Sequence, residues 1–247
     1  MKKMKCTNSN CHQSIRANKF SVGILLSCLL LFGLCTLLAG SLNAQSVLTA
    51  QEVQKIQLKA DKWVNALGLQ EPAKAAKVKG FVRQHLTAVY NWNKTHPATD
   101  VPAGMNPRTG DKLTELDRRM IAQSAMPGSV HKALMDSLNA YLTPEQVGVV
   151  LDGYTVGKVA FTLKGYQAIV PDLTEQETSE ILKNLKQARE TAIDYKNMKS
   201  ISGIFEIYKT KNEKYLNEHG RNWHQLFKNY VNKIKAEKAA KAAGQGK

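Results

Sequence analysis

Apolar residues recur at intervals of three and four positions through most of the chain after residue 48. This spacing lines up one face of an α-helix, whereas a half-buried β-strand needs apolar residues at every second position. The first such run is bounded by Thr49 and Gly68. Its apolar positions are Val53, Ile56, Ala60, Trp63, Val64 and Leu67. Because a chain of such runs buries its apolar faces by packing helix on helix, the pattern predicts an all-α fold.

Three of the runs begin with the same short motif, in which a Leu-Thr pair is followed by Gln or Glu three residues after the threonine. In such a capping box, the threonine hydroxyl accepts a backbone N–H of the first helical turn, and the second side chain accepts the N–H of the threonine. The motif therefore predicts three helix starts. The pairs are Thr49 with Glu52, Thr143 with Gln146, and Thr174 with Glu177.

The same periodicity predicts helices along most of the remaining chain. The predicted helices span residues 72–93, 113–121, 130–141, 174–195, 201–218 and 223–234. Residues 95–110 interrupt the pattern with three prolines and two glycines. Such a composition, without any periodicity, predicts a long loop.

The centre of the chain is less regular, because four glycines occur between residues 143 and 170. Each would cost a regular helix about 1 kcal/mol relative to alanine. We therefore expect an extended turn over residues 152–158, followed by a short helix that ends at Pro171. The whole pattern predicts a single all-α domain, a bundle of about seven to eight helices with an irregular glycine-rich central segment.

The first 44 residues differ from the rest of the chain. Five basic residues and no acidic residue accompany an apolar run from Val22 to Ala39, which is typical of an export signal. We expect cleavage after Ala44 and a mature protein in the periplasm, at the outer-membrane surface or secreted from a Gram-negative cell. Two alternatives stay open, namely an uncleaved membrane anchor and lipid attachment at Cys28.

All four cysteines lie in this signal segment. A chain that has lost residues 1–44 therefore has neither disulfides nor cysteine ligands for a metal. About 200 residues remain, which is enough for one sizeable core. We expect a helical domain over residues 45–227 and a basic C-terminal tail over residues 228–247.

The formal net charge of +15 is unevenly distributed. The signal carries five positive charges, and the tail carries six lysines against a single acid, Glu237, which leaves the helical domain with about +5. The last 15 residues lack the arginines and interleaved aromatic rings of nucleic-acid-binding proteins. We therefore predict no nucleic-acid binding and expect a fraying, solvated helix that associates with anionic polymers of the cell envelope.

A sugar site combines aromatic rings, which cover the apolar face of a sugar, with polar groups that bond its hydroxyls. Residues 90–96, at the end of a predicted helix, and residues 152–158, in the glycine-rich segment, supply both. We expect these two regions to meet in one pocket, although helix packing or a turn would also explain these residue types. The candidate ligand-binding residues are Trp92, His96, Asp152, Tyr154, Lys158, Tyr166 and Arg189.

A longer stretch of the sequence supports a sugar-related function by resemblance. Residues 142–177 read LTPEQVGVVLDGYTVGKVAFTLKGYQAIVPDLTEQE, and the segments QARETAID and YLNEHG follow. Over about residues 48–227, this order of segments resembles an exported family of domains of unknown function in Bacteroidota, associated with sugar binding and found among polysaccharide-utilisation genes. The resemblance implies an accessory protein of glycan utilisation that binds an oligosaccharide or a polysaccharide. The positive charge of the helical domain would favour an acidic one.

Two other functions stay open. The capping motif by itself also resembles small helical periplasmic chaperones. A glycan-processing enzyme would need two suitably spaced carboxylates, and Asp152 with Glu190 or Asp194 could supply them. No motif for a zinc site, a catalytic serine or a phosphate-binding loop occurs in the sequence. We therefore predict no metal and no cofactor, and leave open whether the protein is an enzyme.

Overall fold

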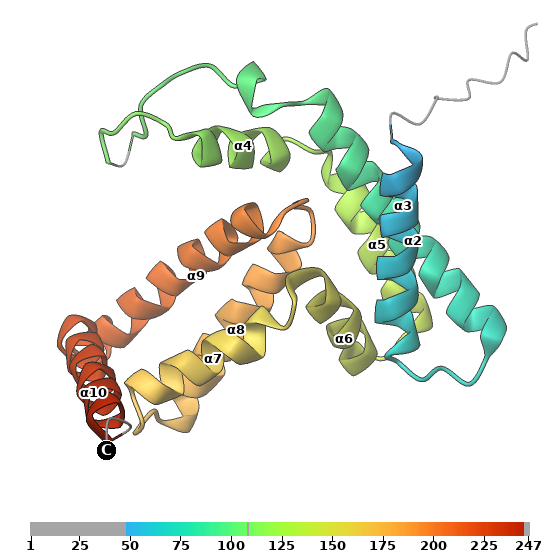
Figure 1. The fold of residues 1–247 in the computed structure, drawn as a ribbon. Helices are drawn as coiled ribbons and strands as arrows, with labels where there is room; N and C mark the ends of the chain where they lie inside the picture. The colour runs from blue at the N-terminus through green and yellow to red at the C-terminus, as the bar shows by residue number, and fades with distance from the viewer. Residues whose placement is uncertain (1–47, 108, 245–247) are drawn as a thin grey trace, which may run out of the picture. The chain divides into compact units, whose positions relative to one another are not determined.

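The computed structural model describes residues 48–107 and 109–244. Within these ranges the chain forms nine α-helices and one short 3₁₀ helix, without a β-strand. These residues belong to one compact unit, which confirms the prediction of a single all-α domain. The elements are α2 (Ala50–Asn65), α3 (Pro72–Thr95), η2 (Ala98–Asp100), α4 (Glu115–Ser124), α5 (Gly128–Tyr141), α6 (Pro144–Thr155), α7 (Lys158–Ile169), α8 (Glu175–Ala192), α9 (Met198–Glu218) and α10 (Trp223–Gly244) (Figure 1). The predicted export signal and its cleavage site at Ala44 lie outside the described residues.

All three predicted capping boxes are present, at the starts of α2, α6 and α8. In α8, the backbone nitrogen of Glu177 lies 3.1 Å from Thr174 Oγ1, and the backbone nitrogen of Thr174 lies 2.8 Å from Glu177 Oε2. A fourth box starts α4, where Asp117 faces Thr114. Because each box uses only residues within one helical turn, it is readable from the sequence.

Two clusters of buried apolar side chains hold the helices together, and each fully buried side chain contributes about 1.5–3 kcal/mol. The first cluster lies among α2, α3, α5 and α6 and includes Val64, Val82, Leu138 and Val150. The second lies among α7, α8, α9 and the start of α10 and includes Ile181, Leu185 and Leu216. In Figure 1, α2 packs along α3 and α8 along α9, whereas α6 contacts both α2 and α8 and so connects the two clusters.

The glycine-rich segment is more regular than the sequence suggests. The predicted turn over residues 152–158 is wrong in its extent, because α6 continues to Thr155 and α7 begins at Lys158. Only Val156 and Gly157 leave the right-handed helical conformation, and both have left-handed backbones, with φ of 54° and 66°. Two short helices joined by one sharp break therefore replace the extended turn.

The C-terminal helix is continuous from Trp223 to Gly244. It therefore crosses the expected boundary between the helical domain, residues 45–227, and the basic tail, residues 228–247. Every residue from 235 to 243 is exposed. Among the described helices, none combines the length and the hydrophobicity needed to cross a membrane.

Candidate functional site

A cleft of about 530 Å³ opens between α7, α9 and α10, and we call it the α7–α10 cleft. Its aromatic lining residues are Phe161, Tyr166, Phe205, Trp223 and Tyr230. Its charged lining residues are Lys158, Lys164, Lys209 and Glu206. A concave surface that combines several aromatic rings with a few charged groups has the composition of a small-ligand site.

Tyr166 and Trp223 form the buried wall of this cleft. Their ring centroids lie 5.2 Å apart at an interplanar angle of 43°, and both side chains are buried. Tyr166 Oη donates a hydrogen bond of 3.2 Å to the backbone oxygen of Lys209, which ties α7 to α9. Burial raises the pKa of Tyr166, so its phenol stays neutral. Phe161, by contrast, is 78% exposed, which places its ring at the open side of the cleft.

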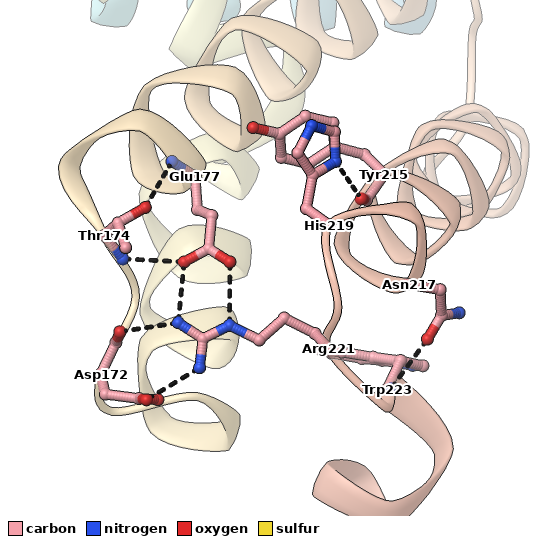
Figure 2. Close-up of polar contacts among 8 residues, drawn as sticks. All are labelled: Asp172, Thr174, Glu177, Tyr215, Asn217, His219, Arg221 and Trp223. Carbon is pink, nitrogen blue, oxygen red and sulfur yellow. Dashed lines mark hydrogen bonds and ion pairs between the residues drawn. The ribbon is translucent and has the colours of Figure 1, made fainter.

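Arg221 fixes the position of Trp223 by holding the turn between α9 and α10 against the start of α8 (Figure 2). Its Nε and Nη2 donate to the two carboxylate oxygens of Glu177, at 2.8 and 2.9 Å. Its Nη1 donates to the carboxylate of Asp172 at 2.8 Å, and Nη2 also donates to the backbone oxygen of Asp172 at 2.9 Å. Such a two-pronged arginine–carboxylate contact restricts orientation as well as distance. The hydrogen bond from Arg221 is the main reason why the pKa of Glu177 is lowered to about 2.

The turn between α9 and α10 has further defined contacts. Gly220 has a φ of 85°, a left-handed conformation that glycine adopts without steric cost. Asn217 Oδ1 accepts the backbone N–H of Trp223 at 2.9 Å, as Figure 2 shows, so α10 starts at a defined residue. The contacts of Arg221 and Asn217 together place the Trp223 ring beside Tyr166.

Three lysines and one glutamate supply the charge of the cleft. Lys209 pairs with Glu206 at 3.2 Å and with Glu213 at 3.8 Å. Within residues 48–107 and 109–244, no ion pair involves Lys158 or Lys164, and Lys158 Nζ lies 5.5 Å from the centroid of the Phe205 ring. Two ammonium groups are therefore available to an anionic ligand in the cleft.

The structure places the seven predicted site residues in three locations rather than in one pocket. Lys158 and Tyr166 line the α7–α10 cleft. Trp92 and His96 lie at the end of α3, where their rings stack with centroids 3.5 Å apart. Trp92 Nε1 donates to the backbone oxygen of Ala122 at 2.8 Å and so attaches α3 to α4, while His96 borders a separate polar hollow of about 580 Å³.

The other three predicted residues join α6 to its neighbours. Arg189, from α8, places Nη1 3.0 Å from Asp152 Oδ1 and donates to the backbone oxygen of Gly148 at 3.1 Å. Tyr154 is buried in the first core cluster, with its ring centroid 4.5 Å from that of Trp63. The contacts of Asp152, Tyr154 and Arg189 are therefore contacts between helices, and none of the three residues lines the α7–α10 cleft.

Most of the aromatic residues of the cleft were not predicted from the sequence, namely Phe161, Phe205, Trp223 and Tyr230. A partial signal was present, because Trp223 and Tyr230 are seven residues apart and so share one face of α10. The sequence does not show that this face lies against α7 and α9. Trp223 therefore looked like an ordinary apolar residue of a helix.

A cluster of polar side chains surrounds Asp194, which lies just after α8. Asp194 accepts hydrogen bonds of 2.9 Å from two histidines, His85 Nε2 to Oδ1 and His131 Nδ1 to Oδ2. The other ring nitrogen of His85 lies 3.2 Å from Tyr154 Oη, and that of His131 lies 3.6 Å from Glu190 Oε1. Because an ionised carboxylate only accepts, both histidines donate to Asp194, and Nδ1 of His85 is left within hydrogen-bond distance of the Tyr154 hydroxyl.

This cluster fixes the charge of Asp194. Burial alone would raise the pKa of Asp194, but the hydrogen bonds from His131 and His85 outweigh burial and lower it. The same contact with Asp194 raises the pKa of His131. The cluster joins the end of α8 to α3 and α5, and both ring nitrogens of His85 have partners. Of the carboxylates considered for glycoside hydrolysis, Asp152 faces Arg189 and Asp194 is held by two histidines.

The fold and the cleft define an all-α, single-domain protein with an aromatic, lysine-bearing cleft between three helices. Residues 53–236 match the model of the family DUF3826, described as a protein of unknown function, and the chain therefore belongs to that family. This membership confirms the expected domain of unknown function, and the matched range runs from α2 into α10. No curated protein matches the sequence.

Proposed function

We propose that the protein is an exported accessory protein of glycan utilisation and that it binds carbohydrate in the α7–α10 cleft. The observation that carries this proposal is the combination of an exposed Phe161 ring and a half-buried Tyr230 ring in one cleft, whose floor is formed by the buried Tyr166 and Trp223 side chains. Aromatic faces of this kind cover the apolar side of a sugar ring. The volume of about 530 Å³ falls within the range of roughly 300–1,000 Å³ that is typical of small-ligand sites.

The charge of the cleft favours an acidic sugar. Lys158 and Lys164 lie on the lining without an ion-pair partner in the described part of the chain, so a uronate carboxylate would find two ammonium groups. An exposed ion pair contributes only about 0.2–1 kcal/mol, which is at most about a fivefold change in affinity. The aromatic rings would therefore provide most of the binding energy, and the lysines would provide the preference for acidic over neutral sugars.

The proposal is tested by calorimetric titration of the expected mature chain, residues 45–247, with tetragalacturonate and with maltotetraose. We expect tetragalacturonate to bind more tightly than the neutral tetrasaccharide. Phe161→Ala should weaken binding about three- to tenfold, because an exposed ring leaves the cleft without a change in the core. Lys158→Gln should weaken only the binding of the acidic ligand, by about two- to fivefold.

The matched control is Lys55→Gln on α2, which removes the same charge from an exposed position outside the cleft. This variant should bind both ligands as the wild type does. Failure of both sugars to bind, or an equal loss in Lys55→Gln and Lys158→Gln, would argue against a sugar site in this cleft. The same incubations, examined for new reducing ends, test the alternative of a glycan-processing enzyme.

A chaperone-like function is the second candidate, and the exposed apolar side chains of α7, α9 and α10 favour it. Phe161, Ile207 and Phe227 are 78%, 58% and 45% exposed. Rings and aliphatic chains exposed on neighbouring helices can hold an unfolded client. This function predicts suppression of client aggregation in the absence of any sugar, with a clear loss of that activity in Phe161→Ala.

A further inference from the structure

We propose that the ligand is a polyuronate chain longer than the cleft, and that lysines on one face of α10 bind the part of the chain that extends beyond it. This inference rests on the proposed function, because the cleft has to bind a sugar of the same polymer. It adds a second contact surface and assigns a role to the exposed end of α10.

The exposed part of α10 is strongly basic. Between residues 228 and 244 the helix carries five lysines against one acid, Glu237. Within the described residues, none of these lysines forms an ion pair with a protein carboxylate. At 1.5 Å per residue, the 22 residues of α10 span about 33 Å, and residues 235–243 are all exposed. The helix therefore offers unpaired positive charge well beyond the cleft.

Helical geometry divides these lysines between two faces. Tyr230 lines the cleft, and successive residues of an α-helix are rotated by about 100°. Lys233, Lys238 and Lys241 then lie within about 80° of Tyr230 around the helix axis, whereas Lys228 and Lys235 lie about 140–160° away. A stripe of three lysines therefore starts about one helical turn beyond Tyr230 and spans about 12 Å along α10. Glu237 lies on the same face, so three positive charges there stand against one negative charge.

Helix stability alone does not explain this arrangement. A cation in the last turn of a helix gains about 0.3–1 kcal/mol from the helix dipole, which accounts for Lys241 at most. Lys235 with Lys238, and Lys238 with Lys241, are like-charged neighbours three residues apart, and each such pair costs about 0.2–0.5 kcal/mol, a cost that the four-residue spacing of Glu237 from Lys233 and from Lys241 offsets by a similar amount. A polyanion along the helix would turn this repulsion into attraction.

A polyuronate fits this surface better than other polyanions do. Each of its sugar residues presents both an apolar ring face and a carboxylate, which match the aromatic cleft and the lysine stripe respectively. The stripe has no arginine and the end of the helix has no aromatic residue, although nucleic-acid sites commonly use both. The cleft would therefore bind one part of the polymer, and α10 would bind the carboxylates that follow.

The test compares two double variants that remove the same charge from the same helix. Lys238→Gln/Lys241→Gln changes the face beside the cleft, and Lys228→Gln/Lys235→Gln changes the opposite face. Each variant of residues 45–247 is titrated with tetragalacturonate and with dodecagalacturonate at low and high salt. We expect the wild type to bind the dodecamer more tightly than the tetramer, with a steeper loss of affinity as salt increases.

The cleft-side variant should bind the dodecamer about two- to twentyfold more weakly than the wild type and the tetramer equally well. The opposite-face variant should match the wild type on both ligands. If the dodecamer binds no more tightly than the tetramer, or if both variants lose the same affinity, the α10 surface is not part of the site, although the cleft still binds sugar. If neither ligand binds, the proposed function fails together with this inference. Tighter binding of single-stranded DNA or of phosphatidylglycerol vesicles, with the same dependence on Lys238 and Lys241, would also overturn the assignment.

Discussion

Gly153 shows how one residue can be set by a partner far away in the sequence. It lies inside α6, where glycine is unfavourable for a helix. A Cβ at this position would lie 2.4 Å from Cγ of Trp63, far inside the contact distance of two carbon atoms. The Trp63 ring therefore packs directly on the backbone of α6, and glycine is the residue that allows this approach. In the sequence, the Asp-Gly pair at residues 152 and 153 is typical of a turn. Its contact with Trp63 is not visible there, because Trp63 is 90 positions earlier than Gly153.

This close packing predicts opposite effects for two glycine-to-alanine substitutions. Gly153→Ala should destabilise the protein by about 1–3 kcal/mol, because the added methyl group overlaps the Trp63 ring. Gly165→Ala on α7 should stabilise it by about 0.5–1 kcal/mol, because a Cβ there meets nothing within 4 Å and alanine is the better helix former. Both effects are measured as changes in the free energy of unfolding in urea. Equal effects at both positions would show that helix propensity, and not the contact with Trp63, determines the change in the free energy of unfolding.

Among the helices, the contact of Arg221 with α8 has the most direct consequence for the candidate site. The carboxylate of Glu177 serves two purposes, since it completes the capping box of α8 and accepts two hydrogen bonds from Arg221 (Figure 2). The box is a local feature, and its presence was predicted. Its use as the anchor for the start of α10 was not, because Arg221 is 44 residues away from Glu177.

The Glu177 contact predicts a loss of stability in acid. The folded-state pKa of about 2 lies below the ordinary value of 4.5, so the stabilisation is fully present above pH 4.5 and is lost as the pH falls towards 2. Glu177→Gln should cost about 1–2 kcal/mol at neutral pH, allowing for solvent screening, and should flatten the loss of stability below pH 4.5. Urea unfolding at a series of pH values measures both effects. The control Glu180→Gln, which removes an exposed pair with Lys183 on the same helix, should change little. An equal loss in the two variants would contradict the role given to Arg221.

At the scale of the whole domain, the Asp194 cluster connects helices that belong to different core clusters. Asp194 follows α8, whose buried face belongs to the second cluster, and it is held by His85 of α3 and His131 of α5 from the first. The ionisable groups that meet there are Asp194, Glu190, His85, His131 and Tyr154. The stability of this connection between the two core clusters therefore depends on the protonation of Asp194 and His131.

This cluster predicts a change of stability around neutral pH. The pKa of His131 is raised above its ordinary value of 6.5 by the hydrogen bond to Asp194, so the stabilisation by charged His131 is complete below pH 6.5 and is lost as the pH rises through the raised value. The pKa of Asp194 is lowered from 3.8, so its own contribution persists until the pH falls below that value. The melting temperature of the wild type should therefore fall relative to that of His131→Gln as the pH rises above 6.5. The exposed His224→Gln variant is the control, and it should follow the wild type. A constant difference between wild type and His131→Gln at all pH values would contradict this account.

The sequence by itself determined the helices of this protein. Capping boxes and apolar periodicity act within a few residues along the chain, and for this reason the starts of α2, α6 and α8 and the all-α class were readable without coordinates. The tertiary structure alone decided which helix faces meet. The walls of the α7–α10 cleft come from residues between 158 and 230 that are close only after folding, and the need for glycine at position 153 exists only because Trp63 packs there. Contacts between distant segments depend on the packing of the whole core, and no short stretch of sequence specifies that packing.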